Sequence, residues 1–120
     1  MIIGVGIDIV EVARVKRALG RKGFASVTFT PAEMKCYKEA GSPIGTLAAR
    51  FAAKEAVFKA LGTGWVAGTE VEILPNKEGK PLARLSGETL KRSKKARVKT
   101  VHVSLSSHKD YAIGLAVAEA

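Results

Sequence analysis

The sequence predicts an α+β fold, in which a small, mainly antiparallel sheet packs against helices, for a single domain covering residues 1–120. Three observations favour this fold. Apolar residues alternate with period two near both ends of the chain, a helix-capping motif lies at residues 30–33, and a long apolar segment over residues 43–61 ends at a glycine. A chain of 120 residues has room for one hydrophobic core. The expected element order is β-α-α-α-β-β-α-β-β.

The first expected strand, over residues 2–9, has two different faces. Branched apolar side chains make up one face. The other face carries Gly4, Gly6 and Asp8. The two glycines leave space in which a ligand or another stretch of backbone can approach the strand. Residues 11–19 then predict a basic helix that ends near Gly20.

Two further helices are expected in the middle of the chain. Thr30-Pro31-Ala32-Glu33 is a capping box with proline at the first helical position, and its helix should end by Gly41. The longest helix is expected over residues 43–61, with Gly62 as its stop signal.

A hairpin and a short basic helix are expected next. Residues 71–74 and 81–85 are typical of two strands joined by a turn, and the second is an edge strand because it begins with proline. Ser86 is placed to cap a helix that continues to about Lys95.

The last two expected strands cover residues 98–106 and 111–118. In the final strand, large side chains alternate with alanine and glycine, so that one face is large and the other small. Such a strand is typical of a sheet that is covered on both sides. In so short a chain, the second cover could be a neighbouring subunit.

Composition narrows the classes of partner. Twenty Lys and Arg against eleven Asp and Glu leave a net charge of +9, which favours a polyanionic partner or simply keeps the surface soluble. The single cysteine, Cys36, excludes an intrachain disulfide and a cysteine-based metal cluster. No apolar run approaches the roughly 20 residues of a membrane span, and the first residues lack the pattern of a secretory signal, so we predict a cytoplasmic location.

Two acidic residues are candidates for chemistry. Asp8 sits late in an apolar strand, where its carboxylate is paired, bound to a metal, exposed to solvent or used to cap the next helix. Glu55 lies four residues before Lys59, a spacing that by itself is most often a surface ion pair. The flexible segment Gly62-Thr63-Gly64-Trp65 follows directly and could fold over a bound group.

The strand that contains His102, Ser104 and Ser106 is a third candidate. Its polar side chains are ordinary for a half-exposed strand. A Ser-His-Asp hydrolase is excluded by context, because both serines lie within the strand and not at a sharp strand-to-helix turn.

Taken together, these segments resemble the holo-acyl-carrier-protein synthases, the short bacterial class of 4′-phosphopantetheinyl transferases. The resemblance spans nearly the whole chain in the same order. It is carried by Gly4-Val5-Gly6-Ile7-Asp8-Ile9-Val10-Glu11, Arg50-Phe51-Ala52-Ala53-Lys54-Glu55-Ala56, Lys59-Ala60-Leu61-Gly62-Thr63-Gly64, Gly79-Lys80-Pro81 and Val101-His102-Val103-Ser104-Leu105-Ser106. It implies the 4′-phosphopantetheinyl transferase-like fold and a homotrimer with active sites between subunits.

The resemblance also implies a reaction. The phosphopantetheine arm of coenzyme A passes to a serine of apo-acyl carrier protein, leaving adenosine 3′,5′-bisphosphate. Asp8 and Glu55 are implied to bind Mg²⁺, which prefers hard oxygen ligands. Glu55 or a metal-bound hydroxide is expected to accept the serine proton, and Lys59 to contact the diphosphate and assist catalysis.

The nucleotide is implied to contact Arg50 at its adenosine end and the loop residues Gly62 and Thr63. One departure from the family concerns the position after the Ser-Leu-Ser stretch, where a histidine is usual. Ser107 occupies that position here, and His108 follows one residue later. Either residue could therefore supply the family's contact to nucleotide phosphate.

Carrier-protein docking is implied for Arg14 and Arg21, which lie two turns apart if the first helix continues past Gly20. The competing class is a nucleic-acid-binding module that uses the basic residues between 91 and 99. It lacks a helix-turn-helix, stacking aromatics or a zinc knuckle, and we therefore predict no nucleic-acid partner. No membrane partner is expected either.

Overall fold

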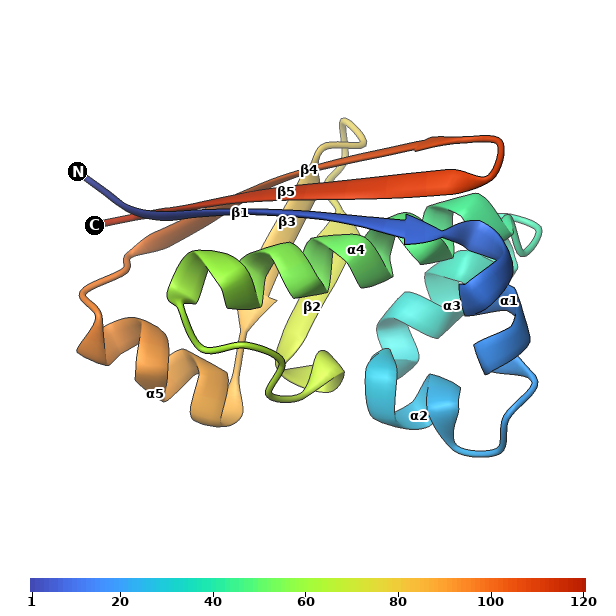
Figure 1. Cartoon of the computed structure of the whole chain (residues 1–120), viewed down its shortest axis with the longest axis horizontal. Coiled ribbons are helices and arrows are strands. Elements are labelled where there is room, and N and C mark those ends of the chain that lie inside the picture. Colours follow the sequence, from blue (N-terminus) through green and yellow to red (C-terminus); the bar gives the residue numbers. More distant parts are fainter.

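The computed structural model describes the whole chain, residues 1–120, and confirms the α+β fold (Figure 1). The predicted strands and helices occur in the predicted order, with one additional short helix and one 3₁₀ turn. The elements are β1 (Ile2–Glu11), α1 (Val12–Leu19), α2 (Phe24–Thr28), α3 (Pro31–Glu39), α4 (Ile44–Leu61), a 3₁₀ turn (Gly68–Glu70), β2 (Val71–Pro75), β3 (Pro81–Leu85), α5 (Gly87–Lys95), β4 (Thr100–His108) and β5 (Tyr111–Glu119).

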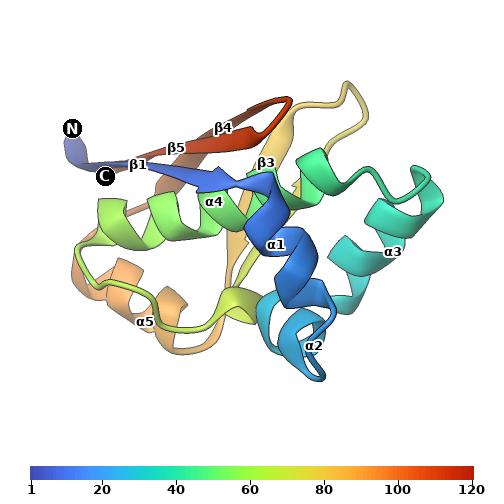
Figure 2. The same ribbon diagram turned by 45° about the vertical axis from the view of Figure 1, so that its right-hand side comes forward.

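The strands form two antiparallel sheets. One sheet has three strands in the order β1-β5-β4, and the other consists of β2 and β3. Pairing of β1 with β5 places Ile2 opposite Glu119, so the two ends of the chain lie side by side (Figure 1). Helix α4 runs beneath the three-stranded sheet, while α1, α2 and α3 gather at one end of the molecule and α5 at the other (Figures 1 and 2).

Helix α4 packs unusually close to the sheet because small residues line the contact. A Cβ atom at Gly6 would lie 1.9 Å from the carbonyl oxygen of Ala56, and one at Gly114 would lie 2.3 Å from the amide nitrogen of Ala53. The space that the sequence predicted beside the glycines of β1 is therefore occupied by the backbone of α4. The small face of β5 packs on the same helix, where Ala116 is fully buried.

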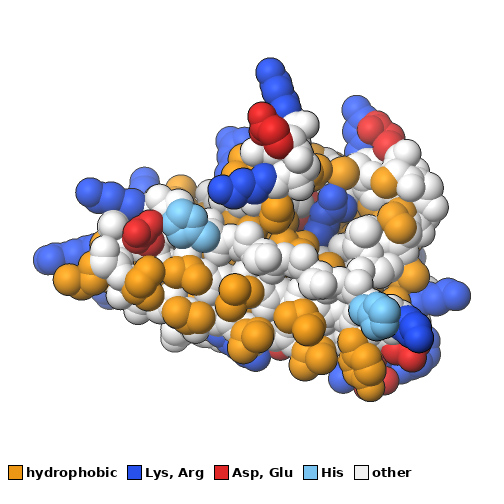
Figure 3. Space-filling view, turned by 90° about the horizontal axis from the view of Figure 1, so that it is seen from above, with side chains coloured by type: hydrophobic (Ala, Val, Ile, Leu, Met, Phe, Trp, Pro, Cys, Tyr) orange, Lys and Arg blue, Asp and Glu red, His pale blue; other side chains and the backbone are white.

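The opposite face of the three-stranded sheet is apolar and uncovered. Val5, Ile7 and Ile9 of β1 are each about 60% exposed, and Ile113 and Leu115 of β5 are more than a third exposed. Figure 3 shows these side chains as a continuous apolar band across the sheet. The sequence predicted a sheet covered on both faces. Within this chain, helix α4 covers one face and nothing covers the other.

A buried ion pair joins α3, α4 and β2. The Nζ atom of Lys54 donates to Oε1 of Glu33 at 2.7 Å, and both side chains are fully buried. Nζ also donates to the carbonyl oxygens of Gly68 and Val71, while Oε2 of Glu33 accepts from the amide of Ile73. Desolvation lowers the pKa of Lys54, and the charge of Glu33 opposes this effect.

The capping box is confirmed and takes part in the same network. The hydroxyl of Thr30 accepts from the amide of Glu33, and the carboxylate of Glu33 accepts from the amide of Thr30. Ser86 does occupy the N-cap position of α5, but its side chain makes no capping hydrogen bond.

Several boundaries differ from the prediction. The sequence did not predict α2, a five-residue helix too short to show a helical period, which begins after Gly23 in the left-handed region (φ +87°). Helix α1 ends at Leu19, and the chain turns at Gly20, so the continuous helix that would align Arg14 with Arg21 does not form. No helix combines the length and apolar character that crossing a membrane requires.

Candidate functional site

The predicted catalytic residues Asp8, Glu55 and Lys59 gather where β1 crosses α4. The Nζ atom of Lys59 lies 3.1 Å from Oδ1 of Asp8 and donates to the carbonyl oxygen of Ile7 at 2.9 Å. Glu55 does not form the surface ion pair with Lys59 that its spacing favours. The lysine joins the helix to the strand instead, and Asp8, with a side chain that is 20% exposed, does not cap α1.

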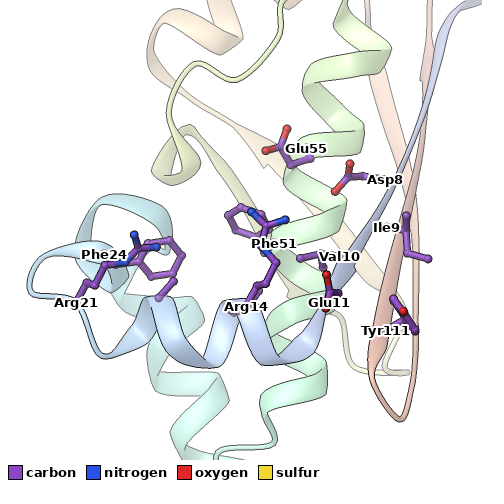
Figure 4. A pocket seen from close by; sticks show the side chains of 12 residues that line it. Asp8, Ile9, Val10, Glu11, Arg14, Arg21, Phe24, Phe51, Glu55 and Tyr111 are labelled. Atoms are coloured by element: carbon purple, nitrogen blue, oxygen red, sulfur yellow. The ribbon is translucent and has the colours of Figure 1, made fainter.

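The cluster disfavours the charge of Glu55. Burial raises the pKa of Glu55, the charge of Asp8 raises it further, and Lys59 partly opposes both effects. Figure 4 shows the two side chains next to each other, one from β1 and one from α4. A bound cation would relieve this repulsion.

The two carboxylates are suitable ligands for Mg²⁺, but they are too few for a metal whose ligands all come from the protein. No group of three or more His, Cys, Asp or Glu side chains could hold an ion. Mg²⁺ typically takes one or two carboxylates and fills its remaining positions with water and substrate phosphate oxygens. Asp8 and Glu55 supply that number of ligands.

A pocket of about 470 Å³ opens beside the carboxylates and extends towards α1 and α2 (Figure 4). Asp8 and Glu55 line it, and so do Arg14 and Arg21, the two predicted docking residues. Although α1 ends before Arg21, the following turn returns its side chain to the pocket, with Cζ 6.0 Å from the ring centre of Phe24. The structure therefore brings the two predicted docking residues and the two carboxylates to one pocket.

Aromatic side chains form a wall of this pocket that sequence reasoning did not identify. Phe24 and Phe51 line the pocket with ring centres 6.2 Å apart, and Trp65 packs on Phe51 at 5.4 Å. Phe51 stood in a recognised motif without an assigned role, and Phe24 belongs to the helix that was not predicted. Trp65 comes from the loop after α4, so that loop supports the wall.

Arg50 lies in a second, smaller pocket of about 250 Å³. Its side chain is only 9% exposed, and its Nη2 atom donates to Sγ of Cys36 at 3.1 Å. Its Nη1 atom is buried and has no hydrogen-bond partner. A nearly buried guanidinium without a carboxylate partner is costly, which favours an anionic ligand at this pocket.

The two pockets share no lining residue. Thr46, Ala49 and Arg50 project into the second from one side of α4, whereas Phe51 and Glu55 project into the first from the opposite side, as the helical period of 3.6 residues requires. The residues predicted for coenzyme A are thus divided between two faces of one chain.

Ser107 and His108 separate in the same way. Ser107 lines the second pocket with Arg50, while alternation along β4 directs His108 to the outer face of the sheet. Gly62 ends α4 in the left-handed region (φ +72°), and the amide of Thr63 donates to the carbonyl oxygen of Phe58. Neither loop residue lines either pocket.

Carboxylates beside a lysine, and an arginine whose charge is unpaired, are groups with which enzymes bind phosphate-bearing compounds. On this α+β scaffold they form a site suited to a phosphate-bearing compound. Residues 4–116 match the 4′-phosphopantetheinyl transferase superfamily, and the chain belongs to that superfamily.

Relatives of known identity agree with this assignment. The chain is 40% identical, over 99% of its length and 97% of the relative's, to a holo-[acyl-carrier-protein] synthase of Clostridium tetani. The crystal structure of such a synthase from Neisseria meningitidis covers 100% of both chains with a TM-score of 0.89 and 36% identity. A synthase from Bacillus anthracis in complex with coenzyme A (3′,5′-ADP) is 34% identical, with a TM-score of 0.82 over 100% of this chain and 98% of that one.

Proposed function

We propose that this protein transfers the 4′-phosphopantetheine group of coenzyme A to a serine of apo-acyl carrier protein, in a Mg²⁺-dependent reaction. The observation that carries the proposal is the pair Asp8 and Glu55, held next to Lys59 in a pocket that two arginines also line. The family and its synthase relatives define the transferred group.

In this mechanism the serine oxygen forms a bond to the β-phosphorus, and the bond between that phosphorus and the diphosphate bridging oxygen breaks. Adenosine 3′,5′-bisphosphate leaves with the electron pair. Mg²⁺, when bound, neutralises charge on the phosphoryl oxygens. Asp8 and Glu55 would hold the ion, and Lys59 adds a positive charge to the same place.

Glu55 is the preferred acceptor for the serine proton. Burial raises the pKa of Glu55 in the metal-free protein, and a bound cation would oppose this shift and keep the carboxylate ionised, which is the form that accepts a proton. Arg50 and Ser107, in the second pocket, are proposed to bind the phosphate at the adenosine end.

A homotrimer with active sites between subunits accounts for the division of the site. One coenzyme A molecule that contacts both sets of residues needs the first pocket of one chain and the second pocket of another. The uncovered apolar face of β1 and β5 offers the surface for such association. The cytoplasmic location, and the absence of nucleic-acid and membrane partners, stay predictions.

The function is tested by incubating the protein with apo-acyl carrier protein, coenzyme A and Mg²⁺ and measuring the intact mass of the carrier. We expect the carrier to gain one phosphopantetheine group, and expect no gain when the metal is chelated. An unchanged carrier in the complete mixture would overturn the proposal. A nucleic-acid-binding module would need neither coenzyme A nor metal and would release its ligand steeply with salt.

Charge reversal at both Arg14 and Arg21 is expected to raise the KM for carrier protein. Each exposed arginine contributes roughly 1 kcal/mol or less to an ionic contact, so removing one charge should change the KM by about five-fold at most. The KM for coenzyme A should stay nearly constant, because nucleotide binding uses Lys59 and Arg50. The difference between variant and wild type should shrink with added salt.

Steady-state kinetics with each substrate varied in turn measure this effect. The matched control is charge reversal at Lys91 and Lys95 on α5, which changes the net charge equally at the far end of the molecule. Equal effects of the two double variants would show that total charge, and not this docking surface, attracts the carrier.

Ser107→His is expected to preserve or strengthen coenzyme A binding, because it places a longer side chain, which carries a positive charge when protonated, in the pocket that Arg50 lines. His108→Ala should change little, since that side chain lies on the other face of β4. Titration calorimetry with coenzyme A measures both. A large loss of coenzyme A affinity in His108→Ala would show that His108, and not Ser107, makes the phosphate contact.

A further inference from the structure

The side chain that holds Arg50 is a thiol. Cys36 of α3 is the hydrogen-bond partner of the guanidinium, through Nη2 at 3.1 Å, while Nη1 has none. No carboxylate pairs with Arg50 anywhere in the chain. Glu33, one turn before Cys36 on the same helix, is fully engaged by Lys54 and by two backbone amides.

The choice of a thiol has an electrostatic consequence. Sulfur is a weak acceptor and carries no charge as a thiol, so Cys36 orients the planar guanidinium without neutralising it. A carboxylate in the same place would form a strong ion pair with two parallel hydrogen bonds, and an incoming anion would have to compete with it. Arg50 therefore keeps its full charge at the edge of the second pocket.

We propose that Cys36 is a positioning residue for nucleotide binding: it fixes the Arg50 guanidinium at the second pocket with its charge available to a phosphate group of the substrate. This inference rests on the proposed function, since it assigns the anion to coenzyme A. It makes Cys36 act through Arg50, without contact to the reacting atoms.

Three substitutions separate orientation from charge. Cys36→Ser keeps an acceptor and should leave coenzyme A binding close to that of the wild type. Cys36→Ala removes the hydrogen bond from the guanidinium to a weak sulfur acceptor and should raise the KM for coenzyme A roughly two- to ten-fold with kcat unchanged. Cys36→Asp should raise it further, because an ion pair with Arg50 neutralises the charge.

The control substrate is 3′-dephospho-coenzyme A, which lacks the phosphate group that we propose Arg50 binds. With this substrate the variants should all resemble the wild type. A merely structural role of Cys36 would instead lower the thermal stability, reduce kcat and affect both substrates equally. That pattern, or an unchanged KM for coenzyme A in Cys36→Ala, would overturn the inference.

Binding and turnover are measured separately so that the inference and the function can fail independently. Titration calorimetry of coenzyme A against each variant reads the Arg50 contact without any carrier protein. If the wild type modifies the carrier but the Ala and Asp variants bind coenzyme A normally, only the role of Cys36 is wrong. If the wild type binds coenzyme A but modifies no carrier, the proposed transfer reaction is wrong. The role of Cys36 is then still tested by coenzyme A affinity, which should fall from the Ser variant to the Ala variant to the Asp variant.

Discussion

Glu55→Gln is expected to lower turnover about a hundred-fold or more while making the ligand-free protein more stable. The loss follows because the variant removes a charged ligand that contributes to stabilising the transferring phosphoryl group. Asp8→Asn should lose activity for the same reason. Both variants should need far more Mg²⁺ for their remaining activity.

The gain in stability follows from the sign of the pKa shift. The folded state raises the pKa of Glu55, so its ionised form is less favourable in the folded chain than in the unfolded one. This unfavourable contribution is absent at pH values below the unfolded pKa and complete above the raised folded pKa. A neutral glutamine removes it, so at neutral pH the melting temperature of the variant should exceed that of the wild type.

Thermal melts with and without Mg²⁺ and coenzyme A, together with carrier-modification rates, measure both effects. Ligands should stabilise the wild type much more than the variant, because only binding to the folded state raises stability. Glu78→Gln, in the exposed turn between β2 and β3, is the matched control and should change neither quantity. Near-normal rates in well-folded Glu55→Gln would remove this residue from the metal site.

Lys54→Met is expected to lower the free energy of unfolding by about 3–5 kcal/mol. The change leaves the Glu33 carboxylate buried without its cation and deprives two backbone carbonyls of a donor. Breaking one side of a buried ion pair is costly because the remaining charge cannot reach water. The methionine fills most of the vacated volume, which limits any additional effect of a cavity.

Urea denaturation at neutral pH measures the loss. The double variant Lys54→Met with Glu33→Gln should lose less than the sum of the two single variants, because removing both charges leaves no unpaired one. Lys35→Met, an exposed lysine of α3, is the control and should have little effect. Equal midpoints for Lys54→Met and Lys35→Met would show that the buried pair contributes nothing net.

The sequence determined the local features of this protein. Period-two alternation placed the small face of β5 correctly, and the capping box at Thr30 fixed the start of α3. These features depend on residues within a few positions of one another, where backbone geometry sets which side chains share a face. The resemblance to a family added the activity, because its motifs record which distant residues function together.

Only the tertiary structure decided which side chains meet. By its position in the sequence, Lys59 could pair with Glu55 or with a residue outside the helix. The packing of β1 against α4 places Asp8 beside Lys59, although the two residues are 51 positions apart in the chain. The same packing left Arg50 on the opposite side of α4 with a thiol as its partner. Local pattern cannot specify such contacts, since they depend on how closely two elements approach. Here that approach is set by glycines that allow the helix to touch the strand.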